Sequence, residues 1–115
     1  MKNYQRGQIW IVNFDPSIGH EYKKIRPALI IQQEQYILSS GLLTVIPISS
    51  KITNLTELDV ILEKNARNRL MKNSLLKVKQ ISSFDKKRFF KLIGIVDKQI
   101  MEIVDNNIKL FLFGM

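Results

Sequence analysis

The chain has 115 residues, 45% of them hydrophobic, and 18 lysines and arginines against 10 aspartates and glutamates give it a formal net charge of +8 at pH 7. This length suits one domain, residues 1–115, and the positive charge favours nucleic acid or an acidic protein as partner, with a lysine-rich surface that serves only solubility as the alternative. The absence of cysteine excludes disulfides, thiolate zinc sites and a cysteine nucleophile. No apolar run approaches the ~18 residues that a membrane span needs, so we expect a cytoplasmic protein without membrane contact.

The first third of the chain predicts two strands joined by a loop. Residues 8–14, QIWIVNF, have the alternation of a strand with Trp10, Val12 and Phe14 on one face. The next segment, DPSIGHEYKK, contains the loop-forming residues Asp, Pro and Gly. Residues 27–33, PALIIQQ, form a short apolar run that is consistent with a strand buried on both faces.

Four further strands are predicted in the middle of the chain. Residues 42–48, LLTVIPI, form another buried run, and residues 88–96, RFFKLIGIV, resemble a sixth strand. Residues 57–63, ELDVILE, alternate strictly. The alternation places Leu58, Val60 and Leu62 inward and Glu57, Asp59, Ile61 and Glu63 on the other face, which is half exposed. In residues 74–81, Leu76 and Val78 lie opposite Lys77 and Lys79, so the two lysines are expected to share one exposed face.

The end of the chain predicts one amphipathic helix, from about residue 97 to 112, with Asp97 as its N-cap. Its apolar residues are spaced as one helical face: Ile100, Ile103, Val104, Ile108 and Phe111. Several short strands followed by one helix predict a mainly β fold, a small SH3-like, strongly bent antiparallel barrel whose edges are closed or covered by the helix.

Arg26 lies at the entrance of a predicted strand, immediately before Pro27. A residue before proline is extended, and proline in a sheet is tolerated mainly at a strand's first residue. If residues 27–33 and 42–48 form a hairpin in which Gln33 faces Leu42, equal steps outward bring Arg26 opposite Ser49. Because the connection is long, the register could slip, and Ser50 is then the alternative.

This arrangement suits a phosphodiester substrate. A guanidinium matches a phosphate in a bidentate way, and a serine hydroxyl can donate to a developing oxyanion. The loop with His20 and Glu21 must return to the same mouth. By residue type alone, a surface salt bridge between Arg26 and Glu21 is favoured. One histidine in the whole chain excludes a paired-histidine mechanism, and the few carboxylates nearby argue against a two-metal nuclease.

The order of several short motifs, carried by four segments, resembles the MazF/PemK toxin family from about residue 6 to 113. The segment RGQIWIVNFDPSIGHEYKKIRPALII is similar to the family's first strand, its Pro-x-x-Gly-x-Glu loop and its Arg-Pro strand entrance. VIPISS is similar to its Pro-Ile-Thr segment, and SLLKVKQISSFDKKRF to its Ser, Gln-Ile and Asp-x-x-Arg stretch. LIGIVDKQIMEIV resembles the turn into its last helix. The resemblance implies a MazF/CcdB-like fold.

The resemblance also implies a function. The family's toxins are metal-independent endoribonucleases without a cofactor, which cut single-stranded RNA at short sequences and leave a 2′,3′-cyclic phosphate. It implies catalytic roles for Arg26 and Ser49, where the family has threonine, and a proton-transfer role for Glu21 or His20. A cognate acidic antitoxin and a homodimer are the implied protein partners. The RNA-binding residues that we expect are His20, Tyr22, Lys23, Lys24, Ser50, Lys51, Lys77, Lys79 and Gln80.

A second departure from the family is Ser82 with Ser83, where relatives often have a basic residue followed by threonine. Two alternatives remain at this point. One is a CcdB-like, non-catalytic inhibitor of DNA gyrase, because the last residues LFLFGM resemble the aromatic-Gly-aliphatic tail of those toxins. The other is an RNA-binding barrel that does not cleave.

Overall fold

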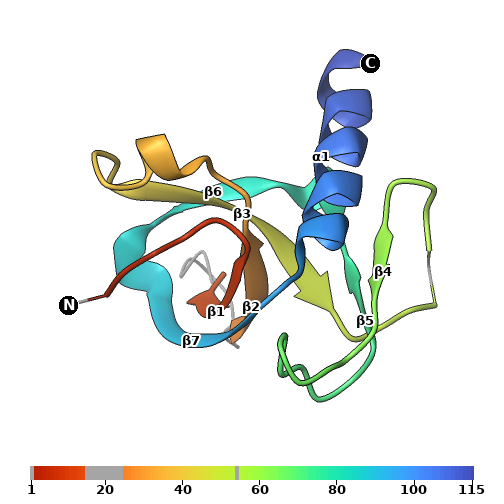
Figure 1. Cartoon of the computed structure of the whole chain (residues 1–115), viewed down its shortest axis with the longest axis horizontal. Helices are drawn as coiled ribbons and strands as arrows, with labels where there is room; N and C mark the ends of the chain where they lie inside the picture. Colours follow the sequence, from red (N-terminus) through yellow and green to blue (C-terminus); the bar gives the residue numbers. More distant parts are fainter. Residues whose placement is uncertain (1, 15–24, 54) are drawn as a thin grey trace, which may run out of the picture.

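One mostly antiparallel sheet with a C-terminal helix forms the described part of the chain, which in the computed structural model comprises residues 2–14, 25–53 and 55–115 (Figure 1). The elements are β1 (Gln8–Asn13), β2 (Ile25–Ile30), the 3₁₀ helix η1 (Glu34–Tyr36), β3 (Leu42–Ser49), β4 (Val60–Leu62), β5 (Ser74–Leu76), the 3₁₀ helix η2 (Val78–Gln80), β6 (Ser82–Asp85), the 3₁₀ helix η3 (Lys86–Arg88), β7 (Phe89–Ile95) and α1 (Lys98–Phe113).

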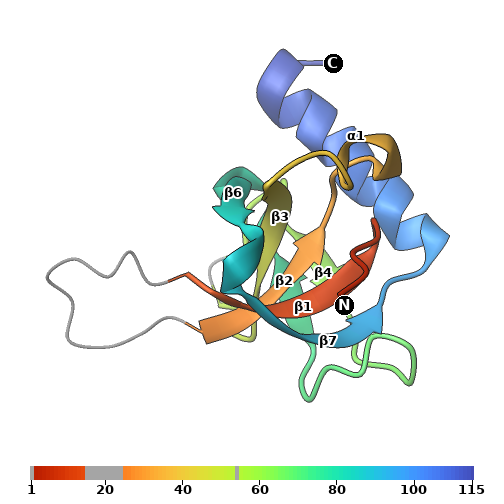
Figure 2. The ribbon, with the colours of Figure 1, turned by 90° about the vertical axis from the view of Figure 1, so that its left-hand side faces the viewer.

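The sheet is strongly bent but not closed. Its strands follow the order β4-β5-β3-β2-β1-β7, and β6 pairs with the first half of β3. The chain then passes from β6 through η3 into β7, which pairs with β1 (Figure 2). No ladder joins β6 to β7 in the described residues. The predicted fold class is confirmed, but the expected closure is not found in the described residues: β6 pairs with β3, and β7 pairs with β1.

Two apolar clusters fill the two sides of the sheet. One contains Ile9, Leu29 and Ile46, and α1 contributes Val104 to it. The other lies inside the bend around Trp10 and Phe89, which are 4% and 0% exposed. Successive residues of β1 thus enter opposite clusters, as expected from the period of a strand. Residues 28–30 of β2 and 45–48 of β3 are buried on both faces, as predicted from the apolar runs. β2 begins two residues before the predicted strand, at Ile25, and ends three residues before its predicted end, at Ile30.

Two predicted strands are shorter in the structure. Only Val60–Leu62 of the segment 57–63 is a strand, because a turn precedes it, in which the Asp59 backbone N–H donates to the Thr56 carbonyl at 3.1 Å. The expected alternation holds, since Val60 and Leu62 are buried and Ile61 is exposed. The strand predicted over 74–81 is wrong beyond Leu76, where the chain turns into η2, and β6 was not predicted.

The predicted helix is confirmed with its cap. The Asp97 carboxylate accepts a hydrogen bond from the Ile100 backbone N–H at 3.0 Å, which satisfies a donor of the first turn. The buried face is narrower than expected, because Ile103 and Phe111 remain 47% and 42% exposed. Figure 1 shows that the last turns of α1, which include Phe111, extend beyond the sheet. In the described part of the chain, no helix has the length and apolar character needed to cross a membrane.

Candidate nucleic-acid cleavage site

The register between β2 and β3 brings two predicted site residues together. Ala28 pairs with Pro47, and Ile30 pairs with Val45. Continuing this register by two residues places Arg26 opposite Ser49, the first of the two alternatives left by the sequence. The register of the hairpin count is found over the three paired positions, and Arg26 and Ser49, which lie just beyond them, line one cavity at the start of β2 and the end of β3.

Arg26 is half-buried next to β1. Its neighbour across the β1–β2 ladder is Val12, and its guanidinium carbon lies 5.6 Å from the centroid of the Phe14 ring. This distance is within the range of a cation–π contact. Phe14 in turn packs edge to face on Phe84, with ring centroids 4.7 Å apart. The Arg26 side chain is thus supported by an aromatic ring on one side and by the fixed backbone of Pro27.

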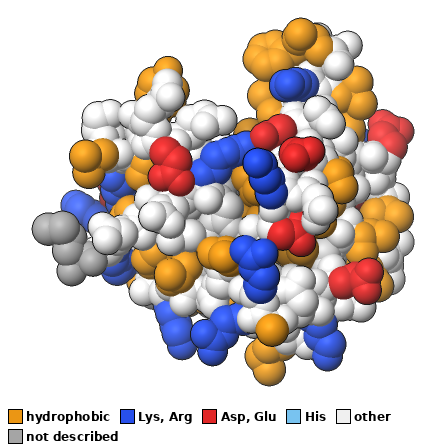
Figure 3. Space-filling model, viewed as in Figure 1, with side chains coloured by type: hydrophobic (Ala, Val, Ile, Leu, Met, Phe, Trp, Pro, Cys, Tyr) orange, Lys and Arg blue, Asp and Glu red, His pale blue; other side chains and the backbone are white. Residues whose placement is uncertain are grey.

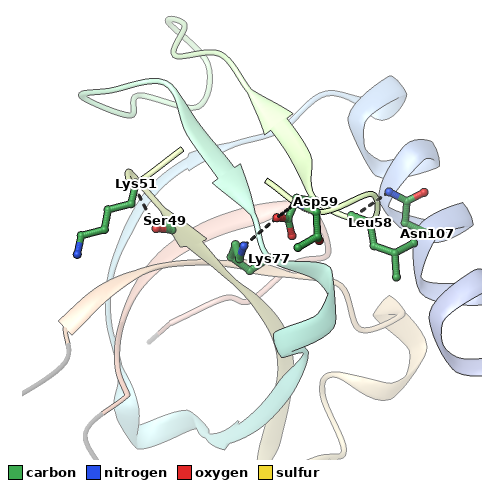
Figure 4. Close-up of polar contacts among 7 residues, drawn as sticks. Ser49, Lys51, Leu58, Asp59, Lys77 and Asn107 are labelled. Carbon is green, nitrogen blue, oxygen red and sulfur yellow. Dashed lines mark hydrogen bonds and ion pairs between the residues drawn. The ribbon is translucent and has the colours of Figure 1, made fainter. Parts of the chain in front are cut away.

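The Ser49 hydroxyl is oriented by the turn that follows β3. Its Oγ accepts a hydrogen bond from the Lys51 backbone N–H at 3.2 Å (Figure 4). Since this contact uses a lone pair, the hydroxyl hydrogen remains able to donate. A half-buried hydroxyl that donates beside a guanidinium is suited to bind a phosphoryl oxygen.

A cavity of about 630 Å³ opens beside Arg26 and Ser49. Its apolar lining includes Ile11, Ile48 and Ile93. Four cationic side chains line it, and no Asp or Glu does so within the described part of the chain: the four are Arg26, Lys51, Arg69 and Lys72. The face seen in Figure 3 differs, because basic side chains there are interspersed with acidic and hydrophobic ones. The cavity therefore favours an anionic ligand with apolar groups.

Sequence reasoning missed two of the four cations, Arg69 and Lys72. Both lie in the connection between β4 and β5, and both are exposed. A local signal was present, because Asn65 and Asn68 lie in this connection and asparagine is typical of turns. Nothing in the local sequence indicates that this connection reaches the mouth formed by β2 and β3.

Apart from Lys77, the expected RNA-binding residues divide into three groups. Ser50 and Lys51 line the cavity. Lys79 and Gln80 are exposed on η2, do not line it, and lie in an element that packs against α1. The expected loop residues lie outside the described residues: His20, Tyr22, Lys23 and Lys24, and with them Glu21, for which a catalytic role was expected.

The prediction that Lys77 and Lys79 share an exposed face is wrong. Lys77 lies where β5 ends, and its Nζ is 2.8 Å from the Oδ2 of Asp59 (Figure 4). The Asp59 side chain is only 1% exposed, although it was expected on an outer face. Burial by itself raises the pKa of Asp59, but hydrogen bonds from Lys77 and the Thr56 backbone N–H, with the charge of Lys77, outweigh it and hold this pKa below its usual range. Lys77 thus joins the two ends of the β4–β5 hairpin.

A bent antiparallel sheet with a C-terminal helix, and a cavity lined by cationic side chains at the start of β2 and the end of β3, define a small β domain with a candidate site for an anionic ligand. The sequence profile of one family, described as PemK-like, MazF-like toxin of type II toxin-antitoxin system, matches residues 5–112. The chain belongs to this family. The resemblance noted in the sequence is thereby confirmed over nearly the whole chain.

Named relatives and solved structures agree with this assignment. Endoribonuclease MazF9 from Mycobacterium tuberculosis is 29% identical over 113 residues, which cover 94% of this chain and 95% of the relative. Endoribonuclease PemK from Escherichia coli is 39% identical over 46 residues, 40% of this chain and 35% of that protein. A MazE-MazF crystal structure from Deinococcus radiodurans matches with a TM-score of 0.81 and 23% identity, covering 100% of this chain and 99% of that one, and supports the fold.

Proposed function

We propose that this toxin is a metal-independent endoribonuclease that cuts single-stranded RNA at specific short sequences. The observation that carries the proposal is that Arg26 and Ser49, which the extended β2–β3 register places opposite each other, line one cavity whose described charged residues are all cationic. Membership of the family and the named endoribonucleases among its relatives support this function over a CcdB-like gyrase inhibitor. They also support it over an RNA-binding domain that does not cleave.

In the proposed reaction, the ribose 2′-oxygen attacks the adjacent phosphorus and the bond from phosphorus to the 5′-oxygen breaks. The products are a 2′,3′-cyclic phosphate and a 5′-hydroxyl. The phosphoryl group gains negative charge in the transition state, and Arg26 stabilises that charge through two parallel N–H donors. The Ser49 hydroxyl adds a third donor to the same oxygens. The hydrogen bond that Ser49 Oγ accepts from the Lys51 backbone N–H holds the oxygen in place before the substrate arrives, and the hydroxyl hydrogen can still rotate toward the phosphoryl group.

Two protons must also move. One leaves the 2′-hydroxyl and one reaches the departing 5′-oxygen. The high pKa of a guanidinium makes arginine a poor proton carrier, so we assign charge stabilisation to Arg26 and proton transfer to Glu21 or His20. Ser50 and Lys51 are assigned to the RNA strand on either side of the cleaved bond.

The partners follow from the same cavity. An acidic segment of a cognate antitoxin, folding as it binds, would compete with RNA for the cationic side chains. Similar structures include an endoribonuclease from a mycobacterial species in complex with its cognate antitoxin, with a TM-score of 0.76 and 14% identity. A homodimer would place two cavities in one assembly and lengthen the RNA path.

One experiment separates the three candidate functions. Purified protein is incubated in EDTA with a mixed-sequence RNA, and the fragments are mapped and their ends analysed. Specific cuts with cyclic phosphate ends support the proposal. Binding without cuts supports a non-cleaving domain, and neither cutting nor binding supports the gyrase inhibitor. Arg26→Ala protein prepared in the same way excludes a contaminating nuclease, because its activity should be absent.

A further inference from the structure

The connection between β4 and β5 is organised by two asparagines. The Asn68 side chain is fully buried; its Oδ1 accepts from the backbone N–H groups of Asn65 and Leu70, both at 3.0 Å, and its Nδ2 donates to the Glu63 carbonyl at 2.8 Å. Asn65 Oδ1 accepts from the backbone N–H groups of Arg67 and Asn68 at 2.9 and 2.8 Å. These bonds replace the ladder that the segment lacks, so its backbone has a defined shape.

This connection is also joined to the opposite edge of the sheet. The Ile95 backbone N–H of β7 donates to the Arg67 carbonyl at 3.0 Å. Gly94 allows the approach, because a Cβ there would lie 2.5 Å from the carbonyl oxygens of both Arg67 and Asn68. β4 and β7 are at the two ends of the strand order, and Figure 2 shows the connection beside β7. It therefore bridges the open sheet next to the cavity.

Arg69 follows this bridge in an unusual backbone conformation. Its φ is 57°, in the left-handed region, and it is the one non-glycine residue with positive φ among the described residues. Its backbone N–H donates to the Asn65 carbonyl at 3.0 Å, so the conformation belongs to the network around the asparagines. A branched or long side chain in this region is disfavoured unless the surroundings impose it. Here they direct Arg69 to the cavity that Arg26 and Ser49 also line.

We propose that Arg69 binds the RNA phosphate next to the one that is cleaved, and so determines how the strand is placed across the cavity. This inference rests on the proposed function. A guanidinium held by a fixed backbone loses little freedom on binding, and its fork matches a phosphate better than an ammonium does. No carboxylate lines the cavity among the described residues to neutralise it. Arg69 is a binding residue in this proposal, whereas Arg26 acts on the cleaved phosphate.

Arg69→Gly is the informative variant, because glycine adopts the left-handed conformation without strain and removes only the side chain. Affinity is measured on an oligonucleotide that contains the cut sequence with a 2′-deoxynucleotide at the cut position, so that no cleavage occurs. We expect binding about tenfold weaker and a shallower dependence on salt, by about 0.7 in the slope of log K against log salt, which corresponds to one phosphate contact in single-stranded RNA. Cleavage should show a raised KM with kcat close to that of the wild type.

A methylphosphonate scan identifies the contact. Neutralising one linkage at a time should weaken wild-type binding at a linkage beside the cut position, and the same replacement should have no effect on Arg69→Gly. If every methylphosphonate weakens the binding of Arg69→Gly as much as it weakens that of the wild type, no linkage depends on Arg69 and the proposal is wrong. Arg67→Ala is the matched control, since it removes a cation from the same connection that does not line the cavity.

The outcomes distinguish this inference from the proposed function. If the wild type neither binds nor cuts RNA, both are wrong. If the wild type cuts, Arg26→Ala does not, and Arg69→Gly matches the wild type in affinity and salt slope, only the inference is wrong. Melting curves verify the fold, because the Tm of Arg69→Gly should equal or exceed that of the wild type.

Discussion

The cavity has two walls of different construction. The first, which we call the strand wall, consists of the start of β2 and the end of β3 and carries Arg26 and Ser49. The second, the loop wall, consists of residues 63–73 and carries Arg69 and Lys72. Ladder hydrogen bonds position the strand wall, whereas side-chain amides and one close backbone approach position the loop wall.

This difference implies different sensitivities to substitution. Ladder hydrogen bonds are made by backbone groups. Replacing a side chain at the start of β2 or the end of β3 therefore leaves the backbone of the strand wall in place and changes only the chemical groups that line the cavity. The loop wall depends on Asn65, Asn68 and Gly94, and a change at one of them displaces the whole wall. Substitutions on the strand wall should therefore affect catalysis, whereas substitutions at these three supporting residues should affect stability and RNA binding together.

The largest effect is expected from Arg26→Ala. It removes the donor that stabilises the phosphoryl charge, and we expect cleavage to fall by at least about 10³-fold. Melting temperature should change little, because a half-buried arginine at a strand end contributes little to stability. Initial cleavage rates on one oligonucleotide, with a melting curve for each protein, test both statements.

Two further variants test the roles of the guanidinium and of the serine hydroxyl. Arg26→Lys should fail nearly as badly, since a point charge cannot make the bidentate contact. Ser49→Ala should lower the rate by about 10²-fold, as expected for the loss of one donor to a developing oxyanion. Full activity of Arg26→Ala would refute the mechanism, and a large fall in its melting temperature would show that the strand wall is not independent of its side chains.

Gly94→Ala tests the loop wall. The added methyl group would lie 2.5 Å from two carbonyl oxygens, and both belong to the backbone, so no side chain can move away to relieve the clash. We expect a loss of about 3 kcal/mol in the free energy of unfolding. The displaced wall should also raise KM more than it lowers kcat. Denaturant melts and steady-state kinetics measure the two effects.

Gly41→Ala is the matched control, because a Cβ there meets no atom within 4 Å. It should leave both stability and KM near the wild-type values. If Gly94→Ala is as stable as the wild type, the connection between β4 and β5 does not contact β7 as closely as described.

The strand wall could be predicted from the sequence because its geometry follows local rules. The apolar runs identify β2 and β3, and equal steps outward along the two strands place Arg26 opposite Ser49. Pro27 lies near the start of β2, which begins two residues earlier than predicted, at Ile25. The capped helix was predictable for the same reason, since its signals lie within one turn of Asp97.

The loop wall could not be predicted in this way. Its shape depends on the contact of Arg67 and Asn68 with Gly94, which is distant in sequence, and local propensity disfavours arginine at a positive φ. The pairing of Asp59 with Lys77 was missed for a related reason. Alternation placed both on outer faces, but the turn before β4 and the 3₁₀ helix after β5 bring them together.

A smaller effect is expected from this ion pair, which joins the ends of the hairpin that carries the loop wall. The pKa of Asp59 is lower in the folded than in the unfolded chain. The pair's stabilisation is therefore complete above the unfolded value of ~3.9 and is lost as the pH falls through the folded value. Asp59→Asn should cost about 2 kcal/mol at neutral pH, because the half-buried Lys77 loses its partner.

Melting curves between pH 7 and pH 3 test this expectation. The difference in Tm between wild type and Asp59→Asn should be constant near neutral pH and shrink in the acid range. Glu57→Gln, which removes an exposed carboxylate from the same segment, is the control and should follow the wild type. A difference that is independent of pH would show that the carboxylate charge does not contribute.

The smallest effect, and the most sensitive test of the strand wall, is expected from Ser49→Thr. The substitution keeps the hydroxyl and adds a methyl group at Cβ, which restricts χ1. If the rate depends on how firmly the hydroxyl is held beside Arg26, threonine should keep the cleavage rate or raise it by a few-fold, with an unchanged KM. A rate as low as that of Ser49→Ala would mean that the added methyl group breaks the contact between Oγ and the Lys51 backbone N–H. Single-turnover rates at saturating enzyme measure the cleavage step apart from binding and product release, so they distinguish a change in the hydroxyl's orientation from a change in RNA affinity.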